Sequence, residues 1–474
     1  MTDTEPAPSG TDTVPLPRAT PESQGVPSEA LLALVRRWER SGLEPHGVLV
    51  LRHGHVVAEG SWTPYRPEGV QLVYSVSKTF TACAVGFAVD EGLLRLEDRV
   101  VDLFPDEAAA ADAGPRTREL TLHDLLAMRT GHRADTLFWR AEEPVPFVQR
   151  VLALEPEEER GWFVYHNGAT RLAALAVQRA AGTRLLDYLR PRLLDPVGIG
   201  PAAWLGSGGA DAGYSGLHVT TDALARLGEL VLHDGAWQGR QVLPPGWAAA
   251  MTTVHTDTSH HPETADWRQG YGYQMWRCTH DAWRADGAYG QFAVVVPGAD
   301  LVLALTSCTE RTQETLDAIW QVLLPALSEG PLPPSADAQE ALTAHLGALT
   351  LPHPVPASVP DGPGPWVFTH EPTEEVPRLA AVTVSPADDG WSLRVDEGEE
   401  VLDVPCGDGA WAPVTGPWTA AGAWTAPGVF ETSVCAVESP HVLHLRCVDG
   451  TVTASWNGVP LAVPALHALP APWA

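Results

Sequence analysis

The sequence predicts an α+β fold, in which helices flank an antiparallel sheet and a helical subdomain interrupts that sheet, followed by a small all-β domain. Strand-like runs occur at residues 46–62 and again at 271–307, while the segment between them has helical periodicity. The sheet must therefore be assembled from both ends of one domain. After residue 366, short β-type runs alternate with turns, which predicts a separate barrel or sandwich.

Changes in composition predict the domain boundaries. Residues 1–20 are rich in Pro, Thr and acidic side chains, and we expect a flexible N-terminus. Residues 21–328 form the α+β domain in this interpretation. A linker with two Pro-rich segments and a short helix follows at 329–365, and the all-β domain occupies 366–474.

The first half of the α+β domain has clear local signals. Residues 28–38 (SEALLALVRRW) have apolar residues at helical spacing, and the run at 46–62 predicts a hairpin that turns at 52–55. Thr121 precedes Asp124 by three residues, which is close to a capping box.

The second half of the domain is predicted to return to the sheet. We expect strands over 271–278 and 289–307, the latter broken by a turn at 297–300, and a final helix over 310–327. These elements follow an amphipathic helix over 221–233.

Charge and cysteine content limit the class of partner. The formal net charge of −29 among 474 residues argues against nucleic acid and anionic membranes, because both require a basic face. The six scattered cysteines include no C-x-x-C pair and predict buried thiols in a reducing compartment. No signal peptide or membrane span is evident, so we expect a cytoplasmic protein without a bound metal or cofactor.

The stretch from Gln71 to Gly92 contains Lys78, which is the single lysine among the 30 basic residues Lys and Arg. Ser75 precedes Lys78 by three residues, so a helix would place both side chains on one face. No charge occurs from Thr79 to Val89, and this helix should therefore be buried. A buried amine tends to lose its proton, whereas arginine keeps its charge. Lys78 is thus a candidate base beside the Ser75 hydroxyl.

Tyr165 is the candidate for a second base that relays the proton. It lies in FVYHNG, where Asn167 follows two residues later. A phenolate beside a lysine would stabilise the reactive forms of both groups. Asn167 is expected to orient Lys78 and to bind a substrate amide. Alternatively, Tyr165 is a half-buried aromatic residue and Asn167 a turn residue.

Two backbone N–H groups are candidates for stabilising an oxyanion. The N–H of Ser75 lies at a helix N-terminus, where the dipole favours negative charge. The strand that reads RADGAYGQF offers a second N–H at Ala288, and Gly287 would allow its backbone to approach a ligand closely.

These motifs together resemble the serine β-lactamase and penicillin-binding-protein superfamily, specifically its class C-like branch of esterases, D-amino-acid peptidases and related hydrolases. Ser75 to Lys78 match Ser-x-x-Lys, and Tyr165 to Asn167 match Tyr-x-Asn. The resemblance covers about residues 20–327. It implies a β-lactamase/transpeptidase-like fold with Ser75 as nucleophile and Lys78 as base. The β-rich C-terminal part resembles an extra, sometimes lipocalin-like domain of some members.

The third family motif differs in this sequence. The family usually has Lys-Thr-Gly or His-x-Gly, whereas this chain has Ala285-Asp286-Gly287. A substrate carboxylate would meet Asp286 instead of a cation, unless Arg284 compensates. Neutral or cationic esters and amides therefore fit better than β-lactams, and Asp286 is a candidate for binding an amine.

Other side chains have weaker claims to function. A polar loop contains His255, His260 and His261, but no acid or cysteine recurs at metal-ligand spacing. Aromatic residues near the motifs would line an acyl pocket or pack in the core; they are Phe138, Trp139, Trp162, Trp267 and Trp283.

Three functions are compatible with the sequence. The first is a serine hydrolase that acts on a small-molecule ester or peptide through an acyl-enzyme on Ser75, with Lys78 and Tyr165 as general bases. The second is an acyltransferase or peptide cyclase, in which an amine or alcohol intercepts the acyl-enzyme. The third is a binding or sensor protein on the same scaffold, with the β domain carrying the interaction.

Overall fold

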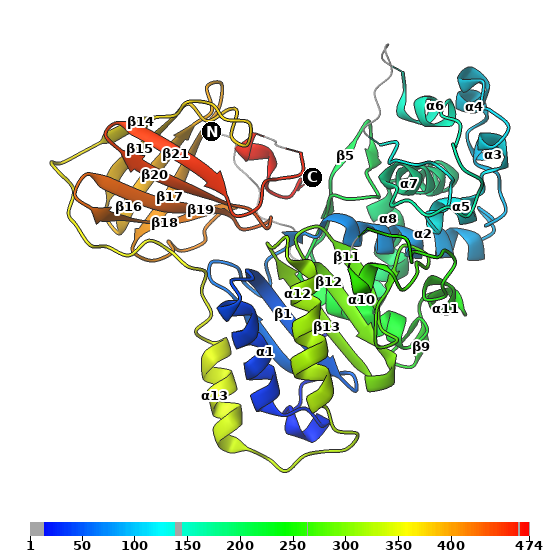
Figure 1. Cartoon of the computed structure of the whole chain (residues 1–474), viewed down its shortest axis with the longest axis horizontal. Coiled ribbons are helices and arrows are strands. Elements are labelled where there is room, and N and C mark those ends of the chain that lie inside the picture. The colour runs from blue at the N-terminus through cyan, green and yellow to red at the C-terminus, as the bar shows by residue number, and fades with distance from the viewer. Residues whose placement is uncertain (1–13, 138–144, 263, 463–464, 474) are drawn as a thin grey trace.

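The computed structural model describes residues 14–137, 145–262, 264–462 and 465–473. It has the predicted α+β domain and, after it, a closed β-barrel. Figure 1 shows three groups of elements, namely a helix-covered sheet, a helical region that contains α2 and α7, and the barrel beside them.

The main sheet is antiparallel throughout and joins both ends of the domain, as predicted. Its strands are, in spatial order, β10 (Trp276–Arg277), β11 (Trp283–Gly287), β12 (Gln291–Val296), β13 (Leu301–Ser307), β1 (Pro45–Arg52) and β2 (His55–Ser61). The turn between β1 and β2 falls where the sequence predicts it. The strand expected over 271–278 is shorter, because Tyr271 instead makes isolated bridges to Thr256 and Trp276.

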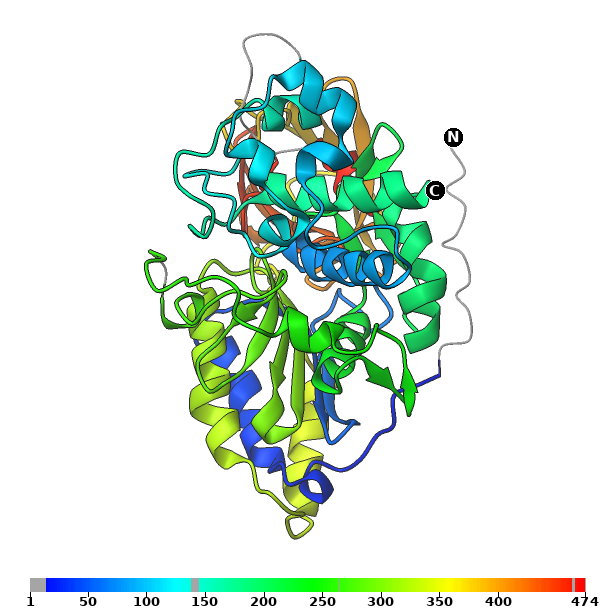
Figure 2. The same cartoon turned by 90° about the vertical axis from the view of Figure 1, so that its right-hand side faces the viewer.

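Helices cover both faces of this sheet. In the lower half of Figure 2, blue and yellow-green helices lie beside the strands and cover one of the two faces. On one face lie α1 (Ser28–Arg40) and α12 (Thr312–Ala318), joined by the Trp38 indole N–H, which donates to the Thr315 carbonyl at 3.2 Å. On the other face α10 (Thr221–Leu232) packs against β1, β12 and β13.

The segment at 329–365 contains the short helix expected from the sequence and also contributes to the core. Its helix α13 (Ala336–Leu346) packs against α1, and Leu342, Leu349 and Leu351 join the same hydrophobic cluster. Apolar side chains at helical spacing explain this packing, since they bury surface against α1.

The helical region between β2 and β10 is built around α2 (Ser77–Asp90), whose residues are buried from Ser77 to Ala88. Helix α7 (Asn167–Ala181) packs on α2, and α5 (Leu122–Leu126) begins with the predicted capping box of Thr121 and Asp124. The other α-helices described are α3 (Val100–Leu103), α4 (Pro105–Ala111), α6 (Phe147–Leu152), α8 (Leu185–Leu189), α9 (Asp195–Val197) and α11 (Trp247–Met251).

Three short sheets support this region. One consists of β3 (Gln71–Leu72), β7 (Leu217–Val219) and β4 (Ala203–Trp204). The others are the pairs β5 (Gly206–Ser207) with β6 (Ala210–Asp211), and β8 (Ala236–Trp237) with β9 (Arg240–Gln241).

The expected flexible N-terminus falls only partly within the described residues. Residues 1–13 lie outside them. From residue 14 onward the chain runs beside β2, where the Val56 N–H donates to the Pro17 carbonyl at 2.8 Å and the Ala19 N–H to the Val56 carbonyl at 3.1 Å. The last part of the predicted N-terminus is therefore bound to the sheet.

The C-terminal domain is a barrel of eight strands. They are β14 (Trp366–Thr369), β15 (Ala381–Ala387), β16 (Gly390–Asp396), β17 (Val401–Asp408), β18 (Trp418–Ala426), β19 (Val429–Ala436), β20 (Val442–Val448) and β21 (Thr451–Trp456). A parallel pairing of β14 with β21, at Thr369 and Thr451, closes the barrel.

Hydrogen bonds attach the barrel to the α+β domain. The Tyr65 hydroxyl donates to the Ser439 carbonyl at 3.0 Å, and the Asn457 amide donates to a Glu44 carboxylate oxygen at 2.7 Å.

Among the helices of the described residues, none combines the length and apolarity that crossing a membrane would require.

A buried carboxylate, Asp266, fixes the segment that leads into β10 and β11. It accepts hydrogen bonds from the Thr279 N–H at 2.8 Å, the Gln313 amide at 2.6 Å and the Trp320 indole at 2.9 Å. Its backbone carbonyl accepts from the Arg284 guanidinium at 2.8 Å. These hydrogen bonds hold the pKa of Asp266 below 3.8 despite its burial, which acts in the opposite direction.

We predict that Asp266→Ala destabilises the protein by about 2–4 kcal/mol, because it leaves buried donors without an acceptor. Chemical denaturation followed by circular dichroism measures this loss. The Asp266 contribution is present above the ordinary carboxyl pKa of 3.8 and is lost as pH falls through the lower folded-state value. Asp403→Ala is the control, because its side chain is 68% exposed and its ion pair with Arg394 at 3.7 Å contributes little. Equal stability of the two variants at neutral pH would contradict the prediction.

Candidate active site

Ser75 and Lys78 meet at the start of α2, as the sequence predicts. Ser75 lies in the 3₁₀ turn Tyr74–Val76, which runs directly into the helix. The Lys78 ammonium Nζ lies 2.7 Å from Ser75 Oγ and donates a second hydrogen bond to the Tyr214 carbonyl at 2.8 Å. This places a basic nitrogen next to the serine hydroxyl.

Burial makes Lys78 a weaker base than an exposed lysine. Its side chain is among the largest that are fully buried. Desolvation lowers the pKa of Lys78 to about 7, although the negative charges of Asp135 and Asp286 act to raise it. A large fraction of Lys78 is therefore neutral near pH 7 and can accept a proton from Ser75.

Tyr165 lies against Lys78 but does not carry the charge expected from the sequence. Its ring centre is 4.8 Å from Lys78 Nζ, and the ring stacks on Trp276 with a centroid distance of 5.7 Å. Burial raises the pKa of Tyr165, while a hydrogen bond with Ser75 lowers it by less. Tyr165 is therefore a phenol at neutral pH and not the expected phenolate, so it meets the serine as a hydrogen-bonding group.

Asn167 is held by a carboxylate that the sequence did not single out. Its amide nitrogen donates to Asp135 Oδ2 at 2.7 Å, and the Gly168 N–H donates to Asp135 Oδ1 at 3.0 Å. Asn167 was expected to orient Lys78, but the two hydrogen bonds of Lys78 go to Ser75 and Tyr214. Asp135 lies 32 residues before Asn167, and no local pattern marks it.

Gly287 brings strand β11 against the segment that carries the nucleophile. A Cβ atom at Gly287 would lie 2.3 Å from the Val73 carbonyl oxygen, closer than atoms can approach. The close approach expected at this glycine is thus made to the protein's own chain. Ala288 follows directly and lines the same cavity as Ser75.

Asp286 has a cationic partner on its own strand. Arg284 Nε donates to Asp286 Oδ2 at 2.7 Å, because residues two apart on a strand point to the same face. The Arg284 side chain is 0% exposed and lies over the rings of Trp267 and Trp276, at 4.2 and 5.7 Å. Ala285, which stands at the cation position of the related motif, is buried, and the residues on either side of it form an internal ion pair.

A cavity of about 610 Å³ opens in front of Ser75. Both domains line it, since Leu461 and Leu469 come from the chain that follows the barrel strands. Its other lining residues are largely apolar or aromatic and include Leu72, Tyr74, Tyr165, Leu205, Tyr214, His261, Trp267, Trp276 and Ala288. No arginine or lysine is among the described residues that line it.

The remaining candidates from the sequence divide between the site and other places. Trp267 and His261 line the cavity, whereas Trp283 packs in the core and Trp162 is 46% exposed and tilted over the His260 ring. Phe138 and Trp139 lie outside the described residues. Within the described part of the chain, no three His, Cys, Asp or Glu side chains are grouped as metal ligands.

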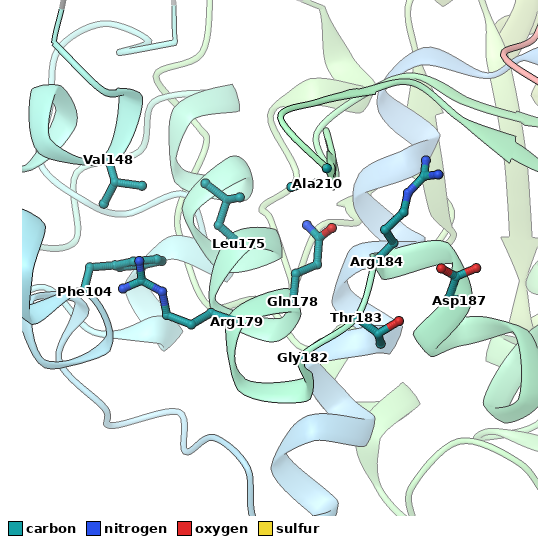
Figure 3. Close-up of a pocket in the computed structure, with 11 residues that line it drawn as sticks. Phe104, Val148, Leu175, Gln178, Arg179, Gly182, Thr183, Arg184, Asp187 and Ala210 are labelled. Carbon is teal, nitrogen blue, oxygen red and sulfur yellow. The ribbon is translucent and has the colours of Figure 1, made fainter. Parts of the chain in front are cut away.

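A second cavity, of about 510 Å³, lies beside α7 and is shown in Figure 3. Its two arginines already have partners, since Arg179 bonds Glu107 at 3.1 Å and Arg184 bonds Asp211 at 2.6 Å. Its described lining contains no serine, cysteine or lysine. The chemistry of nucleophile and base is therefore associated with the cavity at Ser75.

Comparisons with known proteins agree with this fold. A 6-aminohexanoate-dimer hydrolase of Paenarthrobacter ureafaciens is 24% identical over 282 residues, which is 55% of this chain and 71% of the relative. A penicillin-binding-protein homologue from Caulobacter crescentus has a similar fold (TM-score 0.51, 17% identity, 66% of this chain and all of the other). So does EstCE1, described as a hydrolase with promiscuous acyltransferase activity (TM-score 0.52, 17% identity, 62% of this chain and 99% of the other).

A profile of the family named beta-lactamase matches residues 35–327, which contain the nucleophile segment, the Tyr-x-Asn segment and strand β11. This match spans more than half of the chain. The chain belongs to the beta-lactamase family of hydrolases.

Proposed function

We propose that this protein is a serine hydrolase that cleaves a small-molecule ester or amide through an acyl-enzyme on Ser75. The observation that supports the proposal most directly is the 2.7 Å contact between Lys78 Nζ and Ser75 Oγ inside a buried helix start. In its neutral form Lys78 takes the Ser75 proton as the hydroxyl attacks the substrate carbonyl. Tyr165, as a phenol, gives its proton to the leaving group and is reprotonated by the ammonium of Lys78, so that both groups return to their starting forms. Neutral Lys78 then takes a proton from the water that attacks the acyl-enzyme, and that proton returns to Ser75 as the acid product leaves.

The proposed oxyanion site consists of the backbone N–H groups of Ser75 and Ala288. Both residues line the same cavity, and Gly287 allows β11 to pack directly on the segment before Ser75. Fixed N–H donors stabilise the developing negative charge without reorganising during the reaction.

The charge distribution favours a neutral, apolar acyl group. Arg284 is buried and paired with Asp286, so it offers no free cation to a substrate carboxylate. We also propose that a cationic group of a substrate can pair with the Asp286 carboxylate. A reducing compartment such as the cytoplasm is also proposed, supported by six cysteines that are all buried and unbridged.

We predict that a fluorophosphonate probe labels Ser75 and that Ser75→Ala lowers kcat/KM for p-nitrophenyl butyrate by at least about 1,000-fold. Peptide mass spectrometry identifies the labelled residue, and absorbance at the nitrophenolate band gives the rate. Ser207→Ala, an exposed serine on strand β5, is the control and should retain both properties.

The same measurement separates catalysis from binding. A probe that labels a different residue, or full turnover by Ser75→Ala, would refute the hydrolase proposal. A substrate that acylates Ser75 stoichiometrically without turnover would instead support the sensor interpretation.

We predict that kcat/KM rises with pH and levels off above a midpoint of about 7, because only neutral Lys78 accepts the Ser75 proton. The sign follows from burial, which lowers the lysine pKa and makes the amine neutral at a lower pH than usual. Initial rates between about pH 5.5 and 9, corrected for spontaneous hydrolysis, measure this profile. Lys78→Arg keeps its charge throughout and should be inactive at every pH. A flat profile of the wild-type enzyme would contradict this assignment.

Acyl transfer is a second candidate, favoured by the largely apolar cavity wall near Ser75. Such a wall can hold an alcohol or amine beside the acyl-enzyme in competition with water. We predict that, when 1-butanol is added, the ratio of butyl ester to free acid among the products exceeds the ratio of butanol to water concentrations. Gas chromatography of the products measures this ratio. Formation of the free acid alone would reject acyl transfer and leave hydrolysis as the activity.

A further inference from the structure

The residue that precedes the nucleophile has an unusual backbone conformation. Tyr74 has φ of +45°, in the left-handed region that non-glycine residues rarely adopt. Such a conformation costs about 1–3 kcal/mol and persists only where surrounding contacts enforce it. The peptide between Tyr74 and Ser75 carries one N–H of the proposed oxyanion site, so the contacts that fix Tyr74 bear on catalysis.

The barrel domain supplies the main polar contact to Tyr74. The Tyr74 hydroxyl lies 2.5 Å from Nε2 of His441, a fully buried residue directly before β20. His441 Nδ1 lies 2.8 Å from the Gly458 carbonyl, which can only accept, so Nδ1 carries the proton. Burial lowers the pKa of His441 to about 4, which keeps the ring neutral at pH 7. Nε2 is therefore an acceptor, and the Tyr74 hydroxyl donates to it.

His441 also contacts the strand end that carries the second proposed N–H. Tyr289, the residue after Ala288, has φ of +63° and places its ring 5.3 Å from the His441 ring and 5.5 Å from the Tyr74 ring. The Tyr289 hydroxyl donates to the Val459 carbonyl of the barrel domain. The barrel segments that contain His441 and Val459 thus contact both Tyr74 and Tyr289.

Backbone contacts strengthen this attachment. The Leu72 N–H donates to the Glu438 carbonyl at 2.9 Å, two residues before Tyr74. A Cβ atom at Gly458 would lie 3.1 Å from the Tyr289 ring, so glycine allows the loop to approach closely. The segment before Ser75 and the segment after Ala288 are therefore both anchored to the same part of the barrel.

We propose that His441 is a positioning residue for the oxyanion site: through Tyr74 and Tyr289, it fixes the backbone N–H groups of Ser75 and Ala288. This inference rests on the proposed serine hydrolase function. His441 is fully buried and does not line the cavity in front of Ser75, so it acts through the two tyrosines and not on the substrate. The barrel is then a required part of the catalytic unit.

Two single substitutions test the proposal. Tyr74→Phe removes one oxygen atom and His441→Leu removes the acceptor, and each should lower kcat about 10- to 100-fold with KM changed less than about twofold. The double variant should be no slower than the slower single variant, because both remove the same hydrogen bond. His441→Gln, whose side-chain oxygen can accept from Tyr74, should recover most of the lost rate.

The affinity for a boronic acid that forms a tetrahedral adduct on Ser75 reports on the oxyanion site and separates its loss from a loss of folding. This affinity should fall in proportion to kcat/KM in Tyr74→Phe and His441→Leu, because the adduct needs the same N–H donors. His444→Gln is the matched control, since His444 lies on the same strand β20 and bonds Ser433 at 3.0 Å, away from Tyr74. It should have wild-type kcat and boronate affinity.

Wild-type kcat and boronate affinity in Tyr74→Phe would overturn the proposal, and this variant carries the test if His441→Leu does not fold. If the positioning proposal is overturned in this way, fluorophosphonate labelling of Ser75 in the wild type would still leave the hydrolase function intact. Absence of Ser75 labelling in the wild type would instead refute the function on which the inference rests.

Discussion

The burial of the Lys78 amine away from water is the constraint on which the site depends. Lys78 lies at the start of α2, where its amine contacts an uncharged hydroxyl, a backbone carbonyl and an aromatic ring. Burial favours the neutral amine, while two carboxylates at longer range favour the ammonium. A pKa of about 7 is the balance between these effects, and it is the value that makes a lysine useful as a base at neutral pH.

The surroundings of the two carboxylates preserve this balance. Asp286 is bonded to Arg284, and Asp135 accepts hydrogen bonds from Asn167 and Gly168. Each carboxylate therefore has partners of its own, which limits its attraction for a proton on Lys78. The ion pair in the altered third motif thus has a function beyond packing, because an unpaired Asp286 would favour the charged form of the lysine.

Local patterns in the sequence predicted the parts of the site that lie close together along the chain. Ser75 and Lys78 are one helical turn apart, and Gly287 with Ala288 follows a readable strand. The antiparallel sheet built from both ends also followed from the order of strand-like and helical segments. For these features, spacing along the chain directly determines spacing in the fold.

Contacts between distant segments could not be predicted in this way. Asp135 reaches Asn167 across 32 residues, the Tyr214 carbonyl reaches Lys78 across 136, and His441 reaches Tyr74 across 367. A backbone carbonyl has no sequence signature at all. The charge state of Tyr165 could not be predicted in this way either, because its pKa depends on how deeply the ring is buried.

The same electrostatic balance bears on the choice of substrate. A substrate carboxylate about 6 Å from Lys78 would favour the ammonium by about 3 kcal/mol at an effective dielectric constant of about 20, which is about two pKa units. The neutral fraction of the base at pH 7 would then fall from about one half to about one hundredth. A free cation in the cavity could offset this effect, but Arg284 is already bonded to Asp286 and lies beneath the tryptophan rings. An uncharged acyl group leaves Lys78 as it is, and it also fits the apolar wall that the two domains form together.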